Sequence, residues 1–181
     1  FNVRERIDQA RRNSPYLQSV VLVGITKGVD TGRIGEAVSA GLEVIGENRF
    51  QEARGKVQAL GRTVRWHMVG HLQRNKVREA IQLFELIHSV DTLSLAQEIE
   101  KEAARLQKEV PILLQVKVHG QETQYGVEPE TAGRIAKEIS DLNHVKLVGL
   151  MTIAPLSEDA EKSRPYFRRL RELKEAVEKE K

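Results

Sequence analysis

The 181-residue sequence contains no cysteine and few aromatic residues. Without cysteine, disulfide bonds, thiolate metal sites and cysteine nucleophiles are excluded. The absence of cysteine fits a reducing cytoplasm, which is the expected location, and also allows other compartments. Aromatic residues make up 4% of the chain, so a core must rest on valine, isoleucine, leucine and alanine. Hydrophobic residues account for 40% and charged residues for 30%, which is ordinary for a globular domain.

Long apolar runs and an excess of charge of one sign are also absent. The longest apolar run, Val20–Ile25, is far shorter than the roughly 18 residues that span a membrane, so no membrane partner is expected. Lysine and arginine (29) are interleaved with aspartate and glutamate (26), which argues against nucleic-acid binding. The first residues lack a secretory pattern and an initiator methionine, so we expect the sequence to begin inside the natural chain.

The chain repeats one pattern: a short apolar run, a polar turn and a segment with apolar residues at helical spacing. The runs are continuous in valine, isoleucine and leucine, which is typical of parallel strands covered on both faces. The predicted strands are Val20–Thr26, Leu42–Ile45, Arg65–Gly70, Leu86–Val90, Pro111–Val118 and Lys146–Ile153.

Three of the predicted helices are clearest. One is opened by Asp91-Thr92, one begins near Pro129 and one near Pro165. Their predicted inward residues are Leu95, Ile99, Ala103 and Leu106; Ala132, Ile135, Ala136, Ile139 and Leu142; and Phe167, Leu170, Leu173 and Val177.

Six parallel strands without an internal linker predict a single α/β domain over residues 1–181. Such a domain is either an open doubly wound sheet or part of a (β/α)8 barrel. A barrel needs two more βα units and typically about 250 residues, so this alternative implies a missing C-terminal part or a second chain that supplies it. Without these additional units, the two edge strands of the six-stranded sheet would stay unpaired and exposed.

Ligands of parallel α/β folds bind at the carboxyl ends of the strands, so the residues that end each apolar run are the candidates. Lys27 directly follows the first run. Desolvation at the end of an apolar strand favours a neutral, nucleophilic amine, as condensation with an aldehyde requires. The alternative is a lysine that extends its ammonium group into water, and the position alone leaves both open.

Other run ends carry weaker candidates. Asn48 suits a tight strand-to-helix turn and a helix cap. His67 and His71 lack a third ligand nearby, so a zinc site is not expected. We expect His67 to be buried and hydrogen-bonded instead. Met151 either packs in the core or lines a pocket, and the glycine-containing segment 117–127 indicates a functional loop. No P-loop, dinucleotide-binding, zinc-protease or serine-hydrolase motif is present.

Four segments, taken together and in this order, resemble the pyridoxal phosphate homeostasis proteins, the YggS/PROSC family. They are Gly-Ile-Thr-Lys (24–27), Ile-Gly-Glu-Asn-Arg-Phe-Gln-Glu (45–52), Trp-His-Met-Val-Gly-His-Leu-Gln-Arg-Asn-Lys (66–76) and Gly-Leu-Met-Thr (149–152). The resemblance runs over essentially the whole chain. It implies a (β/α)8 TIM-type barrel of the alanine racemase N-terminal kind, with about the first six βα units in this chain.

The resemblance also implies a cofactor. Lys27 matches the lysine that forms an internal aldimine with pyridoxal 5′-phosphate (PLP). Asn48, His67 and Met151 are expected around the cofactor because of their own positions at or near strand ends. The implied role is intracellular PLP homeostasis without a turnover reaction, by a monomer whose partners are PLP and PLP-dependent apoenzymes. Backbone amides at helix N-termini are expected to hold the phosphate, and the family's further phosphate- and ring-holding strands follow the part matched here.

Two positions depart from the family pattern. Thr26 stands where the family has serine and retains the hydroxyl group, and the loop after the fifth strand has Gln124-Tyr125-Gly126 where a lysine or similar residue is usual. Two rival functions remain. An amino-acid racemase on the same barrel would need a second base opposite the lysine, and among the tyrosines only Tyr125 sits on a suitable loop. The other rival is a ligand-free truncated scaffold.

Overall fold

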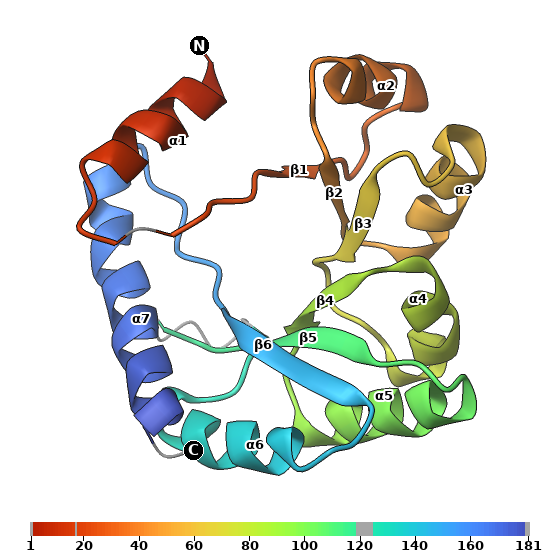
Figure 1. Ribbon diagram of the computed structural model, residues 1–181, viewed down its shortest axis with the longest axis vertical. Coiled ribbons are helices and arrows are strands. Elements are labelled where there is room, and N and C mark those ends of the chain that lie inside the picture. Colours follow the sequence, from red (N-terminus) through yellow and green to blue (C-terminus); the bar gives the residue numbers. More distant parts are fainter. Residues whose placement is uncertain (1, 17, 119–124, 180–181) are drawn as a thin grey trace.

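A computed structural model describes residues 2–16, 18–118 and 125–179 (Figure 1). The strands are β1 (Val23–Ile25), β2 (Val44–Glu47), β3 (Arg65–Met68), β4 (Leu86–Val90), β5 (Val110–Gln115) and β6 (Val145–Met151). The helices are α1 (Val3–Arg12), α2 (Thr31–Ser39), α3 (Phe50–Leu60), α4 (Val77–Leu83), α5 (Leu93–Arg105), α6 (Pro129–Ser140) and α7 (Arg164–Lys179). Short 3₁₀ turns, η1 (Arg74–Lys76) and η2 (Ala160–Ser163), precede α4 and α7.

The strands of the described residues form one parallel sheet in the order β1-β2-β3-β4-β5-β6. Because each strand pairs with the next one along the chain, every crossover turns the same way and carries its helix to the same face. Figure 1 shows α2 to α6 arranged outside a curved sheet. A doubly wound sheet would reverse its strand order at a switch point. The barrel prediction is therefore confirmed, and the open-sheet alternative is wrong.

Each predicted apolar run contains a strand, but the ends of the strands differ from the runs. The first strand is shorter than predicted, because Val20 and Val21 precede the paired residues and are about half exposed. The second extends past Ile45 to Glu47, where its register with β3 continues. After β5, Val116 forms an isolated bridge with Val127 instead of prolonging the strand.

The helix starts follow the predicted signals. The Thr92 side chain caps α5 by accepting a hydrogen bond from the Leu95 amide at 3.2 Å, and Pro129 occupies the first turn of α6. One predicted inward residue is wrong: Phe167 is 53% exposed. It lies in the first turn of α7 and lines a groove with Tyr16, whereas Val177 near the other end of the helix is buried in the core.

The core lies between the outer helices and the sheet. Its largest fully buried side chains are Trp66, Phe84, Ile34, Ile45, Met68, Leu72, Ile81, Ile87, Leu95, Ile99, Ile112 and Leu114. Strand alternation turns the neighbouring side chains toward the inner face of the sheet, which the helices do not cover. Among the described helices, none is long and apolar enough to cross a membrane.

The contrast between Ile99 and Phe167 gives a stability prediction. Ile99→Ala removes a fully buried side chain from α5, so we expect it to lower the free energy of unfolding by about 2–5 kcal/mol. Phe167→Ala removes a half-exposed ring and should cost less than about 1 kcal/mol. Urea denaturation of both variants measures the difference. Equal losses would show that the core boundary is misplaced at α7.

Candidate functional site

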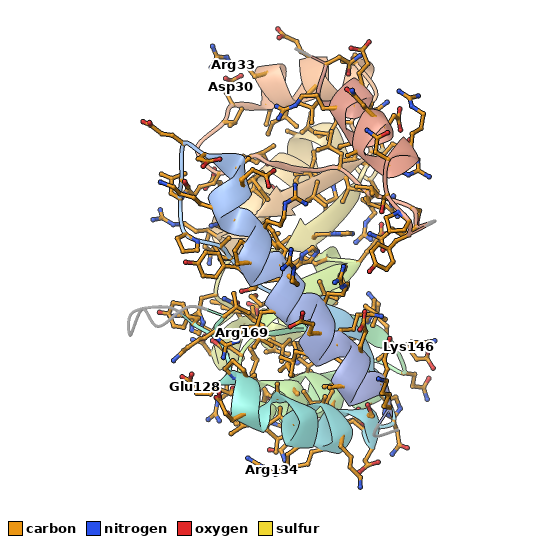
Figure 2. All side chains as sticks on the ribbon, turned by 90° about the vertical axis from the view of Figure 1, so that its left-hand side faces the viewer. Asp30, Arg33, Glu128, Arg134, Lys146 and Arg169 are labelled. Carbon is orange, nitrogen blue, oxygen red and sulfur yellow. The ribbon has the colours of Figure 1, made fainter. Side chains whose placement is uncertain are left out.

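The carboxyl ends of the parallel strands meet at one rim of the sheet. Lys27 follows β1, Asn48 follows β2, His71 lies beyond β3, Asp91 follows β4 and Thr152 follows β6. Figure 2 shows Asp30, three residues after Lys27, on the same side of the molecule as Glu128, which follows the bridge beside β5. Lys146, near the start of β6, is on the opposite side. The predicted strand-end residues therefore share one rim.

Lys27 lies in a tight turn at this rim. The Val29 amide donates to the Thr26 carbonyl at 2.9 Å, and Gly28 has a φ of 72°, a left-handed conformation that suits glycine. Lys27 is exposed, and its amine makes no hydrogen bond or ion pair with another residue in the described part of the chain. Of the two alternatives that the position left open, the exposure of Lys27 matches the side chain that extends into water, since β1 is an edge strand of the described sheet and Lys27 lies beyond its last residue.

A buried lysine from α3 holds this turn from behind. The Lys56 amine donates to the Thr26 carbonyl at 2.5 Å, to Glu47 Oε1 at 2.7 Å and to Glu52 Oε1 at 2.7 Å. Thr26 Oγ1 donates to the same Glu47 oxygen, and the Gly28 amide donates to Glu52 Oε1 at 2.6 Å. We refer to Glu47, Glu52 and Lys56 as the α3 clamp. Lys56 is not among the residues predicted from the sequence, although its spacing of four from Glu52 is typical of an ion pair on a helix.

The charged forms of Lys56 and Glu52 are both favoured at this position. Burial opposes the charged form of Lys56, but hydrogen bonds to Glu47 and Glu52 outweigh it, so the pKa of Lys56 lies above its ordinary value. The hydrogen bond from Lys56, followed by that from the Gly28 amide, lowers the pKa of Glu52. The turn that carries Lys27 is therefore bound by charge-assisted hydrogen bonds, which are the stronger kind.

Asn48 does not cap α3, so that prediction is wrong. The N-cap position is Arg49, which makes no side-chain cap bond. Asn48 Oδ1 is instead buried without a hydrogen-bond partner among the residues that the structure describes. Asn48 also lines a cavity of about 370 Å³ with Met68 and His71. A Cβ placed on Gly70 would lie 2.1 Å from the Asn48 carbonyl oxygen, so the segment after β3 touches the Asn48 backbone directly.

His67 is buried and hydrogen-bonded, as predicted. Its Nδ1 atom is 3.0 Å from Nε2 of His88, a partner that the sequence analysis did not identify. Burial, with smaller contributions from His88 and Arg65, lowers the pKa of His67 to about 4, and burial also lowers the pKa of His88. Both rings are therefore neutral at neutral pH. Met68 and Ile87 beside them belong to the core, so the imidazoles face the inner side of the sheet.

His71 points to a different partner. Its Nδ1 atom is 3.2 Å from Asp91 Oδ2, and its ring stacks on Tyr125 with centroids 4.0 Å apart. The structure therefore separates His71 from His67. Within residues 2–16, 18–118 and 125–179, no group of three histidine or acidic side chains could hold a metal ion.

Met151 is the last residue of β6 and is half-buried beside Gln115 of β5. Gln115 is buried and donates through Nε2 to the Tyr125 carbonyl at 3.0 Å, which links the end of β5 to the returning loop. The predicted functional loop 117–127 falls partly on residues 119–124, which lie outside the described residues. A contact of Met151 with a ligand stays a prediction.

The fold and the strand-end lysine define a class, the barrels of the alanine racemase N-terminal kind. The family described as "Alanine racemase, N-terminal domain" matches residues 2–181. Alanine racemase from Clostridium difficile 630 has the same fold, with a TM-score of 0.73 at 16% identity, over 97% of this chain and 47% of that one.

Nearer relatives narrow this class. The pyridoxal phosphate homeostasis protein of Aquifex aeolicus is 41% identical over 98% of this chain and 79% of its own length. The structure of PipY from Synechococcus elongatus with PLP bound superimposes with a TM-score of 0.83 at 33% identity, covering 99% of this chain and 83% of that one. The chain belongs to the family of pyridoxal phosphate homeostasis proteins.

The histidine pair predicts a pH dependence of stability. Because the folded-state pKa of His67, about 4, is below its ordinary value of 6.5, the unfolded state binds the proton more readily between these values. This contribution is fully present above pH 6.5 and is lost as the pH falls to about 4, at a cost of about 3 kcal/mol.

Denaturation of the wild type and His67→Gln across this pH range measures the effect. Glutamine retains a polar group beside His88 but does not titrate, so the variant should lose less stability than the wild type on acidification. Parallel curves for the two proteins would contradict the assignment, as would an NMR titration that places the pKa of His67 near 6.5.

Proposed function

We propose that this chain binds PLP reversibly through Lys27 and acts in PLP homeostasis without turning over a substrate. The observation that carries the proposal is the Lys27 amine itself. It has no partner in the described part of the chain, and it stands at the carboxyl rim of a parallel barrel wall on a turn anchored at both flanks. Ligand sites of such barrels are built at this rim.

The residues at the rim suit this cofactor. When bound, PLP supplies an aldehyde with which a lysine amine condenses reversibly, with loss of water. A buried acceptor without a partner, such as Asn48 Oδ1, suits a donor group on a ligand. The neutral pair His67 and His88 offers a polar wall without charge, and Met151 an apolar contact at the end of β6.

The relatives support the same proposal. The Aquifex aeolicus relative is named a pyridoxal phosphate homeostasis protein, and the PipY structure contains PLP. For this chain we propose a monomeric carrier whose recipients are PLP-dependent apoenzymes, because a reversibly held aldehyde can pass to another lysine amine. A racemase is the alternative: Tyr125 lies near the rim, but its ring is stacked on His71.

The binding proposal predicts a spectroscopic change. Adding PLP to the full chain should produce a visible absorbance band, and borohydride reduction should fix the added mass on the peptide that contains Lys27. Lys27→Ala should abolish both signals. Lys146→Ala, which removes an exposed lysine at the opposite end of the strands, should leave both unchanged. A wild type without the band would favour the ligand-free scaffold.

The absence of turnover is tested separately. The PLP-loaded chain, incubated with L-alanine in deuterated water, should show no exchange of the Cα proton beyond that caused by free PLP. The physical reason is that racemisation needs a base on each face of the reacting carbon. Exchange at enzyme-like rates accompanied by the appearance of D-alanine, with both lost in Tyr125→Phe, would establish the racemase alternative instead.

A further inference from the structure

The α3 clamp binds both neighbours of Lys27 in the chain. On one side, Thr26 is held by its carbonyl, which accepts from Lys56, and by its hydroxyl, which donates to Glu47. On the other side, the Gly28 amide donates to Glu52 at 2.6 Å. The backbone at Lys27 is therefore fixed from both ends, while its side chain remains exposed.

The Lys56 ammonium group has a hydrogen-bond acceptor for each of its donors. A lysine ammonium group has three N–H donors, and Lys56 has three acceptors: the Thr26 carbonyl, Glu47 and Glu52. Lys56 is 6% exposed and Glu47 is fully buried, so water does not compete for the bond between them, whereas the Glu52 side chain is partly exposed. The clamp thus ties α3, the end of β2 and the turn after β1 to a single buried nitrogen.

Stability alone is a poor explanation for such a network. Burying ions carries a desolvation cost, and well-packed apolar residues of similar volume often hold two elements together as well or better. What the ionic clamp adds is directional bonding to two backbone groups, the Thr26 carbonyl and the Gly28 amide. These two groups flank the lysine that the proposed function requires.

We propose that Lys56 and Glu52 are positioning residues for Lys27, which hold its turn so that the amine is presented at the rim for condensation with an aldehyde. This inference rests on the proposed function. In the condensation, the Lys27 nitrogen bonds to the aldehyde carbon and the carbonyl oxygen leaves as water. Lys56 and Glu52 take no part in that exchange and act only through the backbone at residues 26 to 28.

The test compares two matched variants of the full chain. Glu52→Ala removes the acceptor of the Gly28 amide and leaves Lys56 its partner Glu47. Glu98→Ala removes a glutamate of similar exposure, 27% against 28%, that pairs with Lys101 on α5, away from the turn. The rate of appearance of the visible band is measured with PLP and with pyridoxal, which lacks the phosphate group.

We expect Glu52→Ala to react at least about 10-fold more slowly with both aldehydes, since small misplacements of a reacting group cost rate steeply. In the absence of any aldehyde, hydrogen exchange of the Gly28 amide should become faster. Glu98→Ala should change neither. Glu52→Gln retains an acceptor oxygen and should recover most of the lost rate, which a general loss of stability would not explain.

If the Lys56→Met variant folds, it should react still more slowly than Glu52→Ala. If it does not fold, the rate of the Glu52→Ala variant alone tests the positioning role. If the wild type forms the adduct and Glu52→Ala forms it at the same rate, the positioning role is overturned and the proposal of PLP binding stands. Equal slowing by Glu98→Ala overturns it as well. A wild type that forms no adduct at Lys27 overturns the proposed function, and the positioning role with it.

Discussion

Every feature of this molecule depends on the pairing of each parallel strand with the next strand along the chain. This order sends all crossovers the same way, so the helices cover one face of the sheet and the apolar side chains of that face form the core. The other face turns inward and accepts a polar pair such as His67 and His88. The same order brings the strand ends to one rim, where residues distant in sequence become neighbours.

The elements were largely predictable because their signals are local. Thr92 and Pro129 mark helix starts by capping chemistry and by ring geometry, which need no knowledge of the rest of the fold. The ends of β1 and the exposure of the Phe167 side chain were not predictable from local signals. An apolar residue is buried only where another element covers it, and α7 meets the N-terminal segment at Phe167, where the ring stays half exposed.

In the candidate site, too, only the features with a local sequence signal were predictable. The position of Lys27 at a strand end follows from the apolar run, and its expected role came from the family resemblance. Its support did not: Lys56 meets Thr26 across 30 positions of sequence, and His67 meets His88 across 21. The spacing of four between Glu52 and Lys56 is the one local signal of this network, and by itself it predicts only an ion pair on the helix surface. The expected Asn48 cap failed because Arg49 occupies the N-cap position.

Gly70 has a mechanical consequence for the rim. With no room for even a methyl group between it and the Asn48 carbonyl, the ends of β2 and β3 are in direct backbone contact. The Gly70 carbonyl also accepts a hydrogen bond from Ser89 at 2.6 Å, so β4 joins the same rigid stack. The Asn48 backbone therefore cannot shift toward β3 without moving Gly70, the residue before His71, and the Ser89 side chain carries the connection on to β4.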